Sequence, residues 1–164
     1  MTRRSKNKNK IKKKQQKSSE KLHNIKKHML AETIKVAVYG EYLKKENGND
    51  HEFFKGSKFL GSCESLPLYT MYDLKNFPGV VRNGTTSITL DVYEITRDKL
   101  KKFDKMQNYD ILENDNTLNT FIRKICWTPF GVAKIYFYNS LENNVKIPRI
   151  IKYGNWSQYK KFNN

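Results

Sequence analysis

The segment LKKFDKMQNYD, residues 100–110, is predicted to be a helix that runs into a turn. Leu100, Phe103 and Met106 recur at helical spacing, and Asn108 favours a turn. A carboxylate at the end of this helix could act as a general base. The chain instead has Gln107, whose carboxamide cannot take a proton from an ammonium at neutral pH. Either this position has no catalytic role, or a catalytic role has been lost.

Cysteine and histidine residues give no sign of a metal or redox site. Cys63 and Cys126 are too few and too far apart for a metal site or a disulfide framework, and both lie in apolar, strand-like segments. His23, His28 and His51 show no ligand spacing. We therefore expect buried thiols, no metal and no cofactor.

The rest of the body, from residue 30 on, has mainly the periodicity of strands. Ile34–Tyr39 is an apolar run that ends at Gly40, as expected of a buried central strand. Strands are also expected in residues 57–66, 68–74, 86–95, 117–127 and 131–139, with a turn at residues 76–80, which contain Pro78 and Gly79, and another at residues 129–131. The prediction is an α+β domain with about six strands, mainly antiparallel, and one or two helices.

Two of these elements carry more specific predictions. Residues 86–95 alternate Ile88, Leu90 and Val92 with polar or aromatic residues, which predicts a half-buried strand. Thr96 then follows as a predicted N-cap for the helix that ends near Gln107, with Asp98 in its first turn.

The positive charge is concentrated at the N-terminus. The formal net charge of the 164 residues is +16, and residues 1–29 hold 12 Lys or Arg against a single acid, Glu20. With almost no apolar residues before Leu22, this basic tail is expected to be disordered up to about residue 20. It could bind nucleic acid, another polyanion such as an anionic membrane surface, or an acidic partner, or act as a nuclear address; it could equally be a solvated tail without a partner.

The predicted location is intracellular. No apolar region of a secretory signal follows the basic segment, and no apolar run reaches the ~18 residues that a membrane-spanning helix needs. The chain is expected to work in a reducing compartment, the cytoplasm or the nucleus.

Four motifs in order resemble the gamma-glutamylcyclotransferase-like family, which includes the AIG2-like proteins. They are VAVYGEYL, LYTMYDLKNFPGVV, LDVYEI with the later LKKFDKMQNYD, and AKIYFY with the later YGNW. The resemblance runs from Val36 to Trp156 and implies a domain at residues 30–164 that is a small, mixed β-barrel with a cavity at one end.

The resemblance also implies a chemistry. Family members cyclise a gamma-glutamyl compound when its α-amine attacks the γ-carbonyl, which releases 5-oxoproline. A glutamate at the helix-to-turn position accepts a proton, and loop amides hold the substrate. By this resemblance residues 39–43 would bind a gamma-glutamyl-type small molecule, namely Tyr39, Gly40, Glu41, Tyr42 and Leu43.

This chain departs from the family pattern at two positions. Gln107 stands where the family has its glutamate, and Glu41 stands where the family has Ser or Thr. A carboxylate at residue 41 would repel a substrate carboxylate, or it could point to water and pair with Lys44 or Lys45. The prediction is a pseudoenzyme that acts by binding a ligand or partner.

Two alternatives stay open. Glu41, Asp110 or Glu113 could replace the lost base and leave an active cyclotransferase, whereas Asp104 matches the family's own Asp and is not expected to be the replacement. The chain could also be a nucleic-acid-associated structural protein that uses its basic tail, with strand aromatics such as Tyr136 and Trp127 packing the sheet rather than stacking on bases.

Overall fold

The computed structural model describes residues 16–19, 32–111, 119–139 and 148–163. The chain divides into two units, Met1–Glu32 and Thr33–Asn164. In the first unit, residues 16–19 form a single helical turn. The second unit is the folded domain, and the following description concerns it alone.

The domain contains eight strands, two α-helices and two short 3₁₀ helices among its described residues. In chain order they are β1 (Thr33–Val38), η1 (Gly40–Tyr42), η2 (Glu52–Phe54), β2 (Lys58–Glu64), β3 (Tyr69–Asp73), β4 (Pro78–Thr86), β5 (Thr89–Thr96), α2 (Arg97–Met106), β6 (Phe121–Thr128), β7 (Gly131–Tyr138), β8 (Arg149–Ile151) and α3 (Trp156–Asn163). The predicted α+β class is confirmed, with more strands than expected.

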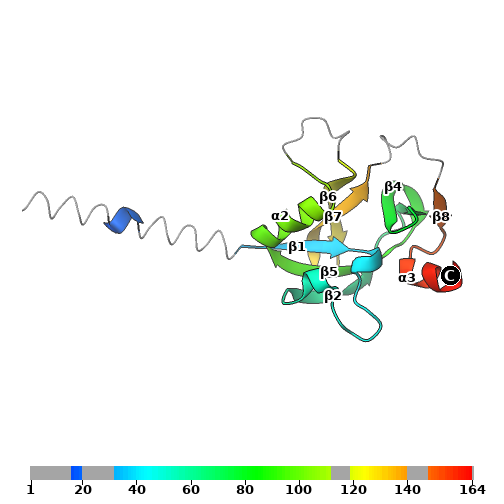
Figure 1. Ribbon diagram of the computed structural model, residues 1–164, viewed down its shortest axis with the longest axis horizontal. Helices are drawn as coiled ribbons and strands as arrows, with labels where there is room; N and C mark the ends of the chain where they lie inside the picture. The colour runs from blue at the N-terminus through cyan, green and yellow to red at the C-terminus, as the bar shows by residue number, and fades with distance from the viewer. Residues whose placement is uncertain (1–15, 20–31, 112–118, 140–147, 164) are drawn as a thin grey trace, which may run out of the picture. The chain divides into compact units, whose positions relative to one another are not determined.

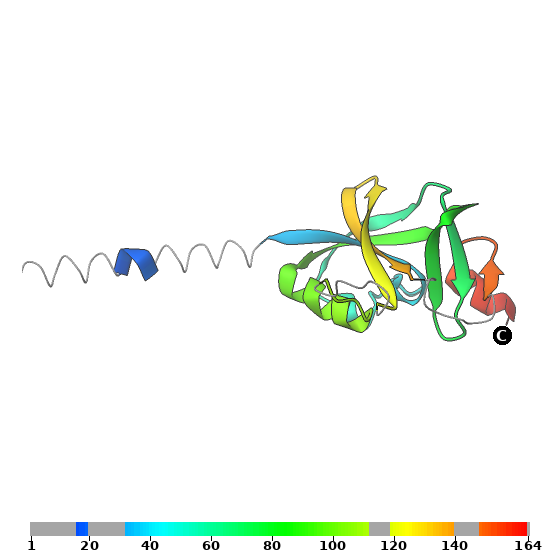
Figure 2. The same ribbon diagram turned by 90° about the horizontal axis from the view of Figure 1, so that it is seen from above.

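The strands form two sheets (Figures 1 and 2). A five-stranded sheet has the order β2-β5-β1-β7-β6, and a three-stranded sheet has the order β4-β3-β8. All pairs are antiparallel except β1 with β7, where Val36 lies opposite Lys134. The sheet is therefore mixed, as the resemblance implied, although the described strands form two sheets instead of one closed barrel.

A hydrophobic core lies on each side of the five-stranded sheet. On one side Leu90 and Val92 of β5 pack with Met71 of β3 and Val80 of β4, which joins the two sheets. On the other side Tyr93 and Ile95 pack with α2 and η2. Full burial of an aromatic or aliphatic side chain contributes about 1.5–3 kcal/mol, so these contacts fix α2 against β1 and β5.

The helix α2 forms as its sequence predicts. The Thr96 hydroxyl accepts a hydrogen bond from the Lys99 backbone N–H at 3.2 Å, which caps the first turn. Leu100 and Phe103 are buried against the sheet. The helix ends at Met106, and Gln107 is its C-cap.

Two predictions about strands are wrong. Residues 78 and 79 belong to β4, opposite Asp73 and Tyr72, and the turn lies just before them at Lys75–Phe77. Pro78 is tolerated because it is the first residue of its strand. The segment 86–95 is not half-buried, because Tyr93 and Asp91 on its second face are also buried, Tyr93 beneath Phe54 of η2.

Within the described part of the chain, no helix is both long enough and apolar enough to cross a membrane.

Candidate functional site

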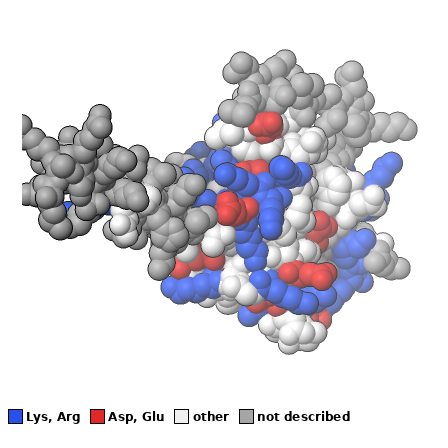
Figure 3. Space-filling model, turned by 60° about the vertical axis from the view of Figure 1, so that its left-hand side comes forward, with Lys and Arg blue, Asp and Glu red and all other residues white. Residues whose placement is uncertain are grey.

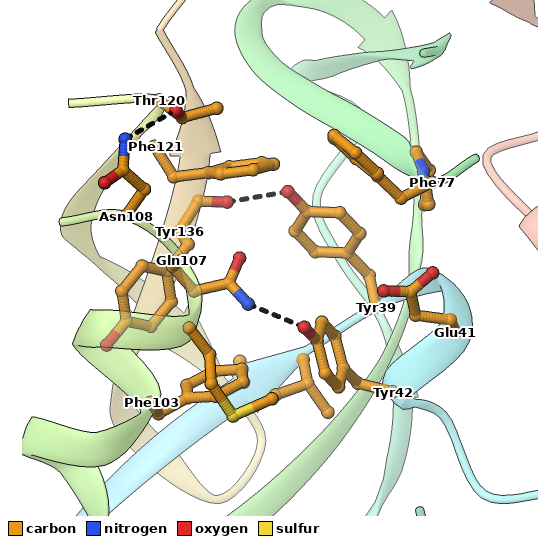
Figure 4. Close-up of a pocket in the computed structure, with 14 residues that line it drawn as sticks. Tyr39, Glu41, Tyr42, Phe77, Phe103, Gln107, Asn108, Thr120, Phe121 and Tyr136 are labelled. Carbon is orange, nitrogen blue, oxygen red and sulfur yellow. Dashed lines mark hydrogen bonds between the residues drawn. The ribbon is translucent and has the colours of Figure 1, made fainter. Parts of the chain in front are cut away.

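A pocket of about 220 Å³ opens where four segments of the domain meet (Figure 4). These segments are the end of β1 with η1, the start of β4, the end of α2, and the β6–β7 pair. The lining residues are Ala37, Val38, Tyr39, Glu41, Tyr42, Phe77, Pro78, Phe103, Met106, Gln107, Asn108, Thr120, Phe121 and Tyr136.

The turn at Gly40 directs the loop toward this pocket. Gly40 has φ +68°, and a Cβ atom at this position would lie 2.3 Å from Cγ of Pro78. A residue with a side chain would be strained by the backbone conformation and would also clash with β4. Gly40 therefore lets η1 begin at once after β1, so that Glu41 and Tyr42 line the pocket while Gly40 itself is buried behind it.

Gln107 faces the same pocket from the end of α2. It is only 7% exposed, and its backbone N–H is bonded to the carbonyls of Phe103 and Asp104. Its side-chain Nε2 donates a hydrogen bond to the Tyr42 hydroxyl at 2.8 Å. The fold thus joins the loop after Tyr39 to the helix end, although Gln107 and Tyr42 are 65 residues apart in the sequence.

The Glu41 carboxylate is directed toward the pocket, while the residue as a whole is exposed at the rim (Figure 4). Among the described residues, Glu41 has no ion pair. The ammonium of the neighbouring Lys44 lies 3.5 Å from Oδ1 of Asp50 instead. Partial burial raises the pKa of Glu41 above its ordinary value, since desolvation disfavours the charged form.

Asp104 has a structural environment. Its carboxylate accepts hydrogen bonds from Nη1 of Arg123 and, at 2.5 Å, from the Tyr136 hydroxyl. Burial is the main cause that raises the pKa of Tyr136 above its usual range, and the hydrogen bond to Asp104 is the second cause. With both partners held in this way, Asp104 ties α2 to the β6–β7 pair and is not among the residues that line the pocket.

The other predicted residues fall into different places. Leu43 does not line this pocket and instead borders a second depression beside α3. Asp110 is also absent from the lining, and Glu113 lies outside the described residues. Tyr39 lines the pocket, and its hydroxyl donates to the backbone carbonyl of Tyr136 at 2.8 Å.

Six of the 14 lining residues are aromatic. The Tyr42 ring contacts Phe103 edge-on at 5.1 Å, Phe103 contacts Tyr136 at 5.0 Å, and Phe77 lies 6.0 Å from Phe121, all between ring centroids. Sequence reasoning did not select Phe77, Asn108, Thr120 or Phe121 for the site. For Asn108 the sequence did offer a signal, because an asparagine directly after a helix often has positive φ and ends the helix. In the structure Asn108 has φ +47°, and its side-chain amide donates a hydrogen bond to the Thr120 hydroxyl.

The residues present do not suggest a metal centre. No cluster of three or more His, Cys, Asp or Glu side chains with suitable geometry occurs in the described ranges. The pocket has one carboxylate (Glu41), two carboxamides (Gln107 and Asn108) and several hydroxyl groups, which suit hydrogen bonding to an organic molecule.

Residues 36–158 match the family described as "Gamma-glutamyl cyclotransferase, AIG2-like". The chain belongs to this family. A relative from Vibrio cholerae serotype O1, named "Putative gamma-glutamylcyclotransferase", is 30% identical over 123 residues, which are 75% of this chain and 95% of the relative.

Solved structures share the fold at lower identity. The Escherichia coli protein ytfP is 24% identical with a TM-score of 0.56, over 77% of this chain and 99% of that protein. Kluyveromyces lactis allophanate hydrolase is 22% identical with a TM-score of 0.61, over 81% of this chain but only 22% of the enzyme. The fold therefore occurs both as a small protein and as one part of a larger enzyme.

Proposed function

We propose that this protein binds a small molecule in the pocket beside Gln107 and Glu41 without carrying out the family's cyclisation. One observation carries the proposal. The side chain that reaches the pocket from the end of α2 is a carboxamide, and it is bonded to the Tyr42 hydroxyl. The proposal takes this position to be that of the family's general base.

The missing carboxylate matters for a physical reason. The attacking α-amine of a gamma-glutamyl compound is an ammonium at neutral pH and must lose a proton before it can react. A carboxamide can hydrogen-bond to an ammonium but cannot take its proton. Loss of a positioned base typically lowers the rate by a factor of about 10²–10⁴.

Glu41 is a second departure, and it weakens recognition of the family's substrate. Its carboxylate lines the pocket where the family pattern has a small hydroxyl residue. Two carboxylates about 4 Å apart repel each other by roughly 1–4 kcal/mol, depending on how much water separates them. A substrate carboxylate would therefore be disfavoured near Glu41.

A second candidate function is an active cyclotransferase in which Glu41 is the base. The raised pKa of Glu41 and its place in the lining favour this candidate, because a general base works best with a pKa near the operating pH and within reach of the proton. The two candidates differ in one measurable quantity, the release of 5-oxoproline.

The test measures 5-oxoproline released from gamma-glutamyl amino acids and gamma-glutamyl amines. We expect no turnover by the unmodified protein and a gain of activity in Gln107→Glu combined with Glu41→Ser, which restores both family residues. Gln158→Glu, which makes the same change outside the pocket, is the matched control and should stay inactive.

Turnover by the unmodified protein would contradict the proposal. If Glu41→Gln then abolished that turnover, the second candidate would replace the first.

A further inference from the structure

Glu41 is the sole acidic side chain among the described residues that line the pocket. No lysine, arginine or histidine belongs to this lining. Its three tyrosines, Tyr39, Tyr42 and Tyr136, all have pKa values raised by burial, so they remain neutral. The pocket consequently has a negative character inside a strongly basic protein.

The charge of Glu41 has no counterion in the described part of the chain, although cations lie nearby in the sequence. Lys44 pairs with Asp50 and lies 4.3 Å from the centroid of the Phe59 ring. Glu46, on the same loop, forms an ion pair with Lys161. Glu41 alone of these loop acids is directed to the pocket instead of to a lysine (Figure 4).

The surroundings of this carboxylate suit a cation with a hydrocarbon chain. The walls are formed by the rings of Tyr39, Tyr42, Phe77, Phe103, Phe121 and Tyr136. Ring faces attract ammonium groups, and the same rings cover apolar chain. Because Nε2 of Gln107 donates to Tyr42, its Oε1 is left as an acceptor for an ammonium N–H (Figure 4).

We propose that the pocket binds a small primary amine in its ammonium form, with Glu41 as the counterion and the aromatic wall around the alkyl chain. The inference rests on the proposed function, that the pocket holds a small molecule. A volume of about 220 Å³ equals roughly seven water molecules at ~30 Å³ each, which is room for an amine of about six carbon atoms.

Three probes of equal chain length separate charge from hydrophobicity: hexylamine, 1-hexanol and hexanoate. Their affinities are measured by calorimetry, and the side-chain amide signals of Gln107 are followed by NMR to locate binding. We expect hexylamine to bind about tenfold or more tightly than 1-hexanol, and hexanoate to bind most weakly, because only the amine pairs with Glu41.

Glu41→Gln keeps the shape of the pocket and removes its charge. We expect this variant to lose about tenfold or more of its hexylamine affinity and to bind 1-hexanol as before. Glu52→Gln, which removes an exposed carboxylate outside the lining, is the matched control and should leave the affinity for hexylamine unchanged.

Equal binding of hexylamine and hexanoate, full hexylamine affinity in Glu41→Gln, or no hexylamine binding at millimolar concentration would each overturn the inference. These outcomes leave the proposed absence of cyclisation intact. Release of 5-oxoproline overturns the proposed function instead, so the two failures are distinguishable.

Discussion

Three carboxylates of the domain differ in what surrounds them. Asp104 is held by Arg123 and Tyr136, and buried Asp91 accepts hydrogen bonds from the Ser62 hydroxyl and the Lys44 backbone N–H. Both acids therefore hold elements of the domain together. Glu41 has no such partner among the described residues, although its charged form is disfavoured by partial burial. Glu41 therefore lowers the stability of the fold and joins no two elements of the domain. A role in binding would explain why the chain has a carboxylate at this position.

This cost predicts a pH-dependent stability. Because burial raises the pKa of Glu41, the folded protein holds this proton to a higher pH than the unfolded chain does. Stability then falls as the pH rises through the interval between the unfolded and folded pKa values, and the destabilisation is complete above it. We expect Glu41→Gln to melt at a higher temperature than the unmodified protein at pH 7, and the difference to shrink toward about pH 4.

The measurement is thermal unfolding of both proteins across this pH range, without ligand. Glu52→Gln controls for the loss of one negative charge from a protein of net charge +16, which by itself increases charge repulsion. A Glu41→Gln variant that is less stable than Glu52→Gln at pH 7 would show that Glu41 has a stabilising partner.

At the scale of elements, the turn between β1 and η1 shapes the pocket, and this gives a prediction for Gly40. Gly40 and Gly48 both have positive φ, +68° and +79°, but a Cβ at Gly40 would meet Pro78 whereas a Cβ at Gly48 would meet nothing within 4 Å. We expect Gly48→Ala to cost about 1–2 kcal/mol from backbone strain alone. Gly40→Ala should cost about 2–5 kcal/mol, because steric overlap adds to the same strain.

Chemical denaturation of both variants measures these costs. The folded fraction of the Gly40→Ala variant can also be titrated with hexylamine. We expect it to bind hexylamine more weakly than the unmodified protein, because the loop that carries Glu41 must move away from β4. Equal destabilisation by the two substitutions would mean that the Gly40–Pro78 contact does not shape the loop.

Local sequence patterns predicted which segments form helices and strands better than they predicted how those segments are buried. The spacing of Leu100, Phe103 and Met106, with Thr96 before them, was enough to place α2 correctly. The alternation in residues 86–95 identified β5 but could not show that α2 and η2 cover its second face, because those contacts come from distant segments. Pro78 and Gly79 favour a turn by type, yet the hydrogen bonds to β3 place them in a strand.

The candidate site was predicted only in part for the same reason. Tyr39, Glu41 and Gln107 could be selected because the family resemblance covers their motifs, and all three line the pocket. Phe77, Thr120 and Phe121 lie in segments without a distinctive motif, and only the packing of β4 and β6 around the helix end brings them to the wall. Leu43 was selected by the same resemblance, as the last residue of the motif VAVYGEYL, but it borders another depression.

At the scale of the whole molecule, the charge of the folded domain differs from that of the N-terminal segment. Residues 30–164 contain 20 basic and 15 acidic residues, and on the face in Figure 3 the basic side chains are interrupted by acidic ones. A surface of mixed charge binds polyanions weakly, so we assign any polyanion binding to residues 1–29.

This assignment predicts a steep dependence on salt. If all 12 basic residues of Met1–Met29 neutralised phosphates of duplex DNA, the slope of log affinity against log salt concentration would reach at most about −11, since each neutralised phosphate contributes about −0.9. We expect a short DNA duplex to bind the full chain at low salt with a slope of several units. Deletion of residues 1–29 should abolish this binding and leave the melting temperature of the domain unchanged, because Thr33–Asn164 forms a compact unit of its own.

Fluorescence anisotropy across a salt series measures the slope, and circular dichroism confirms that the truncated protein is folded. Retention of most of the affinity by the truncated protein would place the binding site on the domain, and no binding by the full chain would identify the segment as a solvated tail.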